Sequence, residues 1–171
     1  MRITIFMGSP RSGGNTAAMA KAFEEGAKKA GHDVTVLNVG SMKISGCRYC
    51  DWCHTKGGGK CVQKDDMQEV YEILKGTDML VFASPIYYFT MSAQIQAAIQ
   101  RFFCIERPES VKKAFLLLSS ESDGVYDAAK AQYRDMLSYM GIEDKGVITA
   151  HGAENKSEEK LSEIRRAAES L

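Results

Sequence analysis

The chain of 171 residues carries 22 Lys and Arg against 22 Asp and Glu, so its formal net charge is zero. This balance, without a basic run, argues against nucleic acid or an anionic membrane as a partner. No apolar stretch approaches the roughly 20 residues of a membrane-spanning helix, and the first residues lack the pattern of an export signal. We therefore expect a single domain over residues 1–171 that works in the cytoplasm.

An apolar run from Arg2 to Met7 predicts the first buried strand. The loop after it reads GSPRSGGNT over residues 8–16 and leads into a helix, which an apolar stripe from Met19 to Ala30 indicates. Its glycines, hydroxyls, arginine and helix N-terminus are suited to holding a phosphate. The loop has neither the G-x-G-x-x-G nor the GK[ST] pattern, which favours a mononucleotide.

We expect six residues of this loop to contact the phosphate: Ser9, Arg11, Ser12, Gly13, Asn15 and Thr16. The alternative is an ordinary glycine-rich connection in which Asn15 caps the helix.

After a second predicted strand, Asp33 to Asn38, comes a cysteine-rich loop at about residues 45–64. Its cysteines, with the pattern C-x2-C-x2-C-x7-C, are Cys47, Cys50, Cys53 and Cys61. They lie too close together for a typical disulfide framework. Four thiolates suit a [4Fe-4S] cluster or tetrahedral zinc, and free thiols or an adventitious disulfide are the remaining alternative. Cys104, outside this loop, is assigned to the core.

A third predicted strand, Met79 to Ala83, follows a helix over Met67 to Leu74 and leads into the loop SPIYYFTMS at residues 84–92. Three consecutive aromatic residues cannot all face a core, so a planar ligand is expected to lie against them. The residues that we expect to contact it are Pro85, Ile86, Tyr87, Tyr88 and Phe89. The alternative is a hydrophobic loop that packs against a partner subunit, and the two interpretations are compatible.

The remaining strands are predicted at Lys113 to Ser119 and Gly146 to Ala150. Helical stripes, all assigned to the core, run from Ile95 to Phe103, Ala129 to Met140 and Leu161 to Leu171. Ser119 and Ser120 begin a third loop and are further ligand candidates.

The alternation of strands and helices predicts an α/β fold: a three-layer sandwich with a five-stranded parallel sheet and helices on both faces. Right-handed crossovers leave the flavodoxin-like order 2-1-3-4-5 as the common solution at this length. Ligands then bind at the carboxyl ends of strands one, three and four.

The loop at residues 8–16 and the segment S-P-I-Y-Y at residues 84–88 resemble the NADPH-dependent FMN reductase family of the flavodoxin-like superfamily. The cysteine spacing resembles that of iron-sulfur flavoproteins of the same fold, and the likeness covers about residues 1–120. It implies FMN with its ring beside Pro85 to Phe89, NAD(P)H as electron donor, and a homo-oligomer. The acidic, serine-rich third loop departs from the family pattern, and Val62 stands where ferredoxin motifs have proline.

The leading hypothesis is an FMN-dependent oxidoreductase that passes electrons to a second acceptor, without side chains acting as acids or bases. The alternative is an electron carrier whose cysteines hold a [4Fe-4S] cluster and exchange electrons with a ferredoxin-like partner. A third hypothesis is a sensing or structural module that binds zinc.

Overall fold

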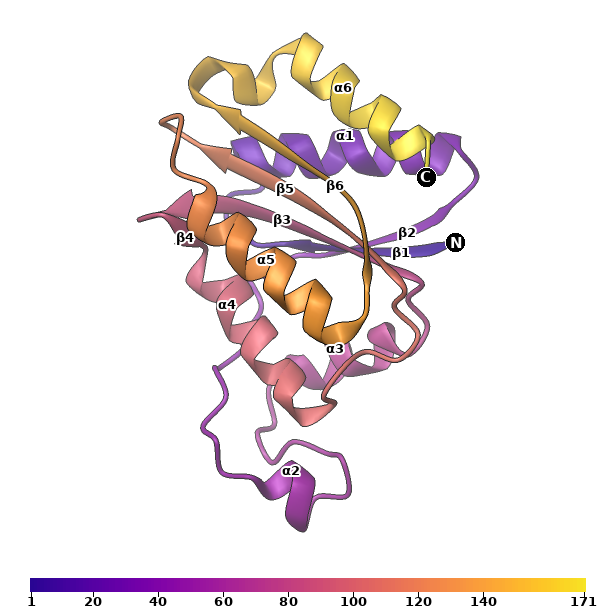
Figure 1. The fold of residues 1–171 in the computed structure, drawn as a ribbon, viewed down its shortest axis with the longest axis vertical. Helices are drawn as coiled ribbons and strands as arrows, with labels where there is room; N and C mark the ends of the chain where they lie inside the picture. The colour runs from indigo at the N-terminus through magenta and orange to yellow at the C-terminus, as the bar shows by residue number, and fades with distance from the viewer.

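The computed structural model describes residues 1–171 and contains one six-stranded sheet (Figure 1). Five strands are parallel in the order β2-β1-β3-β5-β6, and β4 pairs with β3 alone, antiparallel to it. With β4 set aside, this is the predicted flavodoxin-like order. The strands are β1 (Arg2–Met7), β2 (Asp33–Leu37), β3 (Met79–Tyr87), β4 (Thr90–Met91), β5 (Lys113–Ser120) and β6 (Glu143–His151).

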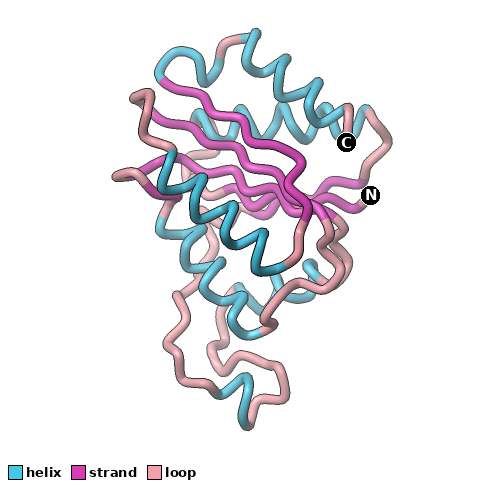
Figure 2. Tube along the Cα trace, viewed as in Figure 1, coloured by secondary structure: helices cyan, strands magenta, loops and turns pink.

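Helices cover both faces of the sheet, which confirms the predicted three layers (Figures 1 and 2). One face carries α1 (Asn15–Lys29) and α6 (Glu158–Glu169), and the other carries α3 (Met67–Leu74), α4 (Ala93–Gln100) and α5 (Asp127–Met140). Successive residues of a strand point to opposite faces, so Ile5 packs under α1 while Phe6 belongs to the opposite core. Short helical turns are α2 (Trp52–Thr55), η1 (Arg101–Cys104) and η2 (Gly152–Lys156). No helix combines the length and apolar character that a membrane crossing requires.

The contact between α1 and α6 depends on a glycine. A Cβ atom added to Gly26 would overlap the backbone carbonyl of Arg165. The two helices therefore approach at backbone distance, and a larger residue at position 26 would force them apart.

The structure corrects several predicted boundaries. The third strand ends at Tyr87 and not at Ala83, because it continues into the hairpin with β4. Proline inside a run normally argues against a central strand, but Pro85 occupies the last position of β3 that pairs with β5, opposite Ser119. The predicted ligand residues Pro85, Ile86 and Tyr87 are thus strand residues.

Three further corrections are smaller. The last strand begins at Glu143, three residues earlier than predicted, and the second ends at Leu37. Phe103, assigned to the core from its helical spacing, is 37% exposed. The reason is that α4 ends at Gln100 and the chain continues as the tighter turn η1, which shifts the direction of the following side chains.

Candidate functional site

The loop between β1 and α1 is shaped by its own hydrogen bonds. The amide of Gly8 donates to the carbonyl of Ala83 in β3 at 2.8 Å. Ser9 is buried, and its Oγ accepts a hydrogen bond from the amide of Arg11 at 3.2 Å. The amide of Gly14 then donates to the carbonyl of Arg11 at 3.0 Å. These hydrogen bonds within the chain fix the shape of the loop.

Several amide groups of this loop have no partner. The N–H groups of Ser12, Gly13, Asn15 and Thr16 donate to no acceptor within the chain. Gly14 stands at the N-cap position of α1, no side chain caps the helix, and its first turn holds no acidic residue. Asn15 is the first helical residue, so the interpretation in which it caps the helix is wrong. These free donors at the positive end of a helix form an anion-binding arrangement.

Two cations border the same loop. Arg11 is exposed within it, and Lys156 of η2 donates from Nζ to the carbonyl of Gly13 at 2.8 Å. The sequence analysis missed Lys156, which is 143 positions away from Gly13. The one signal in the sequence that could have indicated this contact is that Lys156 follows the last predicted strand, whose carboxyl end lies at the same edge of the sheet as the loop. An anion placed at the loop would thus meet positive charge from two segments.

The three predicted ligand loops meet at the carboxyl edge of the sheet. Ser92, which caps α4, accepts a hydrogen bond at its Oγ from the amide of Ile95 and donates from it to the carbonyl of Gly8 at 2.8 Å. Its amide donates to Oγ of Ser84 at 2.9 Å. The buried hydroxyls of Thr16 and Ser119 are 2.7 Å apart and join α1 to β5. The structure brings together the loops after β1, β3 and β5, as predicted.

The hydroxyls of the two serines at the end of β5 are occupied by protein groups. Ser119 pairs with Thr16, and Ser120 lies 2.6 Å from the hydroxyl of Tyr126 and also donates to the carbonyl of Ser122. Both serines are buried. Their side chains hold the loop in place, and their contact with a ligand stays a prediction.

The aromatic segment forms a strained hairpin turn. Ile86 pairs with Met91 and Tyr87 with Thr90, which leaves Tyr88 and Phe89 as the two turn residues. Their φ angles are 50° and 70°, in the left-handed region that Asn-Gly normally occupies in such turns. Tyr88 is 94% and Phe89 55% exposed, and their amides donate to no acceptor within the chain. Exposed rings and free amides therefore stand together in the turn that precedes Ser92, which contacts the phosphate loop.

The cysteine segment extends away from the sheet and contains α2 (Figures 1 and 2). All five cysteines are free thiols and border one cavity of about 10 Å³, together with Arg101. No three metal-ligating side chains converge on one ion, so the structure holds no preformed tetrahedral zinc site. A [4Fe-4S] cluster needs four thiolates arranged around one core, and the cysteines do not form such a group in the structure. The assignment of Cys47, Cys50, Cys53 and Cys61 as cluster ligands stays a prediction.

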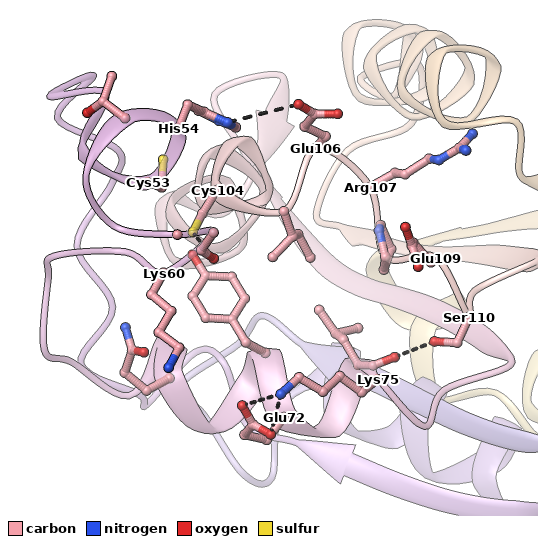
Figure 3. Close-up of a pocket in the computed structure, with 18 residues that line it drawn as sticks. Cys53, His54, Lys60, Glu72, Lys75, Cys104, Glu106, Arg107, Glu109 and Ser110 are labelled. Atoms are coloured by element: carbon pink, nitrogen blue, oxygen red, sulfur yellow. Dashed lines mark hydrogen bonds and ion pairs between the residues drawn. The ribbon is translucent and has the colours of Figure 1, made fainter.

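A second, larger cavity of about 1190 Å³ opens beside the cysteine segment (Figure 3). Cys53 and Cys104 border both cavities. Ionisable side chains surround the larger cavity, including the ion pair Lys75–Glu72 at 2.6 Å and His54, whose Nδ1 is 3.9 Å from Oε1 of Glu106. Burial raises the pKa of the Cys104 thiol, and the neighbouring Cys53 raises it further. Cys104 is buried as predicted, but its place beside the other four cysteines was missed.

Comparison with known proteins agrees with this arrangement. An iron-sulfur flavoprotein of Archaeoglobus fulgidus is 36% identical over 101 residues, which are 59% of this chain and 45% of that protein. A putative NAD(P)H-dependent FMN-containing oxidoreductase of Bacillus subtilis is 27% identical over 89% of this chain and 86% of its own length. The chain spans about half the length of the iron-sulfur flavoproteins that it matches.

Solved structures share the fold. The NAD(P)H:quinone oxidoreductase of Methanothermobacter marburgensis superposes with a TM-score of 0.80 at 19% identity, over 100% of this chain and 96% of that one. The family model described as NADPH-dependent FMN reductase matches residues 1–150, the region that holds β1 to β5, all of β6 except its last residue, and all three loops of the candidate site. The chain therefore belongs to the NADPH-dependent FMN reductase family.

Proposed function

We propose that the chain is an FMN-dependent oxidoreductase that takes reducing equivalents from a nicotinamide nucleotide and passes them to a second acceptor. The observation that carries this proposal is the loop between β1 and α1, with four unpartnered amides and two nearby cations. The loop suits a phosphate monoester, and its place at the switch point of the sheet is where such folds bind nucleotides. Membership of the NADPH-dependent FMN reductase family supports FMN as the molecule that carries this phosphate.

The residues at this edge of the sheet fit both the phosphate and the ring of FMN. The unpartnered amides of the loop and the side chains of Arg11 and Lys156 would hold the phosphate. The amides of Tyr88 and Phe89 would face the ring edge, since they are unpartnered and belong to exposed residues. When bound, FMN supplies hydride and single-electron chemistry.

The role of the chain's own residues would be to bind the phosphate, to orient the flavin and to exclude water from one of its edges. Ser9 and Ser92 fix the loop through buried hydrogen bonds, so little ordering entropy is lost when the phosphate enters. The exposed rings of Tyr88 and Phe89 would shield one edge of the flavin from water. No acid or base is required of the side chains, because proton and electron movements belong to the cofactor and its substrates.

Anaerobic purification is expected to yield FMN at about one molecule per chain, or to allow its reconstitution to that level. The flavin should be released by denaturation, identified by mass spectrometry and then tested for bleaching by NADPH and by NADH. Bleaching followed by reoxidation with a quinone or another acceptor supports the oxidoreductase. Release of FAD alone, or no flavin binding after reconstitution, would contradict the mononucleotide proposal.

A second candidate function is supported by the cysteines. We propose that Cys47, Cys50, Cys53 and Cys61 hold a [4Fe-4S] cluster, so that the chain exchanges single electrons with a partner. The specific observation is that all four border one cavity with a buried arginine that has unpartnered donors. The larger cavity beside them gives a partner access to this end of the molecule.

Reconstitution with iron and sulfide under exclusion of oxygen is expected to give about four irons per chain. Serine at Cys47, Cys50, Cys53 or Cys61 should lower the iron content by at least half, because serine is a poorer ligand for iron than thiolate. The matched control is Cys104→Ala, which lies at the same cavity outside the motif and should keep its iron. FMN should stay bound in every variant, since the phosphate loop leaves a different strand. Stoichiometric zinc in place of iron would contradict the cluster.

A further inference from the structure

The turn η2 brings a lysine from beyond β6 to the phosphate loop. The ammonium group of Lys156 donates to the carbonyl of Gly13 at 2.8 Å. The other end of the same peptide unit, the amide of Gly14, donates to the carbonyl of Arg11 at 3.0 Å. Both polar groups of this peptide are therefore engaged, which fixes its orientation, while the neighbouring amide of Gly13 donates to no acceptor in the chain.

No carboxylate neutralises the charge of Lys156. The two acidic residues that stand two positions away from it have other partners. Oε1 of Glu154 lies 3.5 Å from Nζ of Lys160, and Oε1 of Glu158 lies 2.8 Å from Nη1 of Arg165. An ammonium group has three donors, and Lys156 uses one of them within the chain. Its charge and its remaining donors are thus available to an anion at the loop.

The residue before Lys156 anchors η2 to the sheet. Asn155 is 0% exposed, and its Nδ2 donates to the carbonyl of Ser120 at 2.8 Å and to that of Gly152 at 2.9 Å. The first bond ties η2 to the end of β5, and the second closes the turn on itself. Because Oδ1 of Asn155 has no partner, these two bonds are the polar contacts that hold the side chain. They set the position from which the flexible side chain of Lys156 extends.

We infer that Asn155 and Lys156 form a phosphate clamp that makes the site prefer FMN over riboflavin, the same flavin without a phosphate. Lys156 is the group that contacts the phosphate, and Asn155 is the positioning residue that acts through it. The inference rests on the proposed function, since it concerns the same loop. η2 lies beyond residues 1–150, which the family model matches, so the clamp follows from the contacts of this chain.

Replacing Lys156 by Gln is expected to lower the affinity for FMN by about tenfold to a hundredfold, because a charge-assisted hydrogen bond to the phosphate is lost. The affinity for riboflavin should stay within about twofold of wild type, since riboflavin has no group for the ammonium to contact. The FMN affinity of this variant should also depend less on salt than that of wild type, because salt screens the interaction between the ammonium and the phosphate.

Asn155→Ala is expected to give the same selective loss of FMN affinity, since Lys156 then extends from a displaced turn. The double variant Asn155→Ala with Lys156→Gln should bind FMN no more weakly than Lys156→Gln alone, because two residues that act through one contact are not additive. A merely structural role of Asn155 would weaken the binding of both flavins and would add to the effect of Lys156→Gln.

Fluorescence titration of the apoprotein with each flavin measures these affinities, and urea unfolding of the same preparations checks the fold. The matched control is Lys21→Gln, which removes the same charge from an exposed position of α1 and should bind both flavins as wild type does. Selective loss of FMN affinity in both single variants, without addition in the double variant, supports the clamp. If riboflavin binds too weakly to titrate, the salt dependence of FMN binding takes its place in each comparison.

The remaining outcomes overturn the clamp in distinguishable ways. If wild type binds FMN and Lys156→Gln binds it equally well, or loses both flavins alike, the clamp is overturned while the FMN site stands. If the losses in the double variant add, Asn155 does not act through Lys156. If Asn155→Ala does not fold, Asn155→Ser decides in its place, and failure of both to fold assigns Asn155 to the fold alone. If wild type binds no flavin, the proposed function fails and the clamp with it.

Discussion

Replacing Asn15 by Asp is expected to weaken FMN binding by at least a hundredfold without lowering the stability of the protein. The new carboxylate would stand at the first position of α1, among the unpartnered amides. Repulsion between two unit charges 4 Å apart is about 1 kcal/mol in water and about 4 kcal/mol near a protein surface. Loss of the expected hydrogen bond from the Asn15 side-chain amide to the charged phosphate adds roughly 1.5–3 kcal/mol. In the free protein, by contrast, an acidic residue at a helix N-terminus stabilises by about 0.3–1 kcal/mol.

Fluorescence titration of the apoprotein with FMN measures the first effect, and urea unfolding of the apoprotein measures the second. The matched control is Lys21→Gln, which changes the net charge by the same amount at an exposed position of the same helix. Its FMN affinity should stay within about twofold of wild type, since exposed charges beyond a Debye length are screened. Equal affinities of Asn15→Asp and Lys21→Gln would place the phosphate elsewhere.

Replacing the turn Tyr88-Phe89 by Asn-Gly is expected to stabilise the apoprotein by about 2 kcal/mol and to lower its affinity for FMN. Left-handed backbone costs an ordinary residue roughly 1–2 kcal/mol, and Asn-Gly is the pair that this turn type prefers. Little burial is lost, because Tyr88 is 94% exposed. The wild-type protein is thus expected to be less stable than the Asn-Gly variant, as is typical where strained residues serve binding.

Urea unfolding and FMN titration should be run on the same preparation of this double variant. The control is Tyr88→Ala with Phe89→Ala, which removes the rings but keeps a Cβ at both positions. It should lose FMN affinity without the gain in stability. A stabilised Asn-Gly variant that binds FMN as tightly as wild type would show that the rings do not contact the flavin.

Most of the fold could be predicted from local patterns. Buried parallel strands appear as short apolar runs and their covering helices as apolar stripes, and few topologies connect five such units. The phosphate loop was equally visible, because glycines, hydroxyls and a helix start occur together within residues 8–16. Each of these signals is contained in a short stretch of chain.

The features that the sequence did not predict depend on contacts between residues distant in sequence, or on residues that depart from the usual turn and strand preferences. Lys156 reaches the phosphate loop only because β6 ends at the same edge as β1. The β3–β4 hairpin places two aromatic residues where turn chemistry favours Asn-Gly, and it includes a proline. Arg101 lies next to an apolar stripe and resembles an ordinary exposed arginine, until the fold places Asp65 and the cysteines around it.

The backbone contact between Gly26 and Arg165 has a consequence for the order of assembly during translation. Ribosomes add about 5–20 residues per second, so roughly ten seconds separate the appearance of α1 from that of α6. Throughout this interval the Gly26 side of α1 lacks the helix that covers it in the finished protein. The nascent chain therefore exposes the side of α1 around Gly26 to chaperones until α6 has emerged, and the core between these helices and the sheet is completed only then.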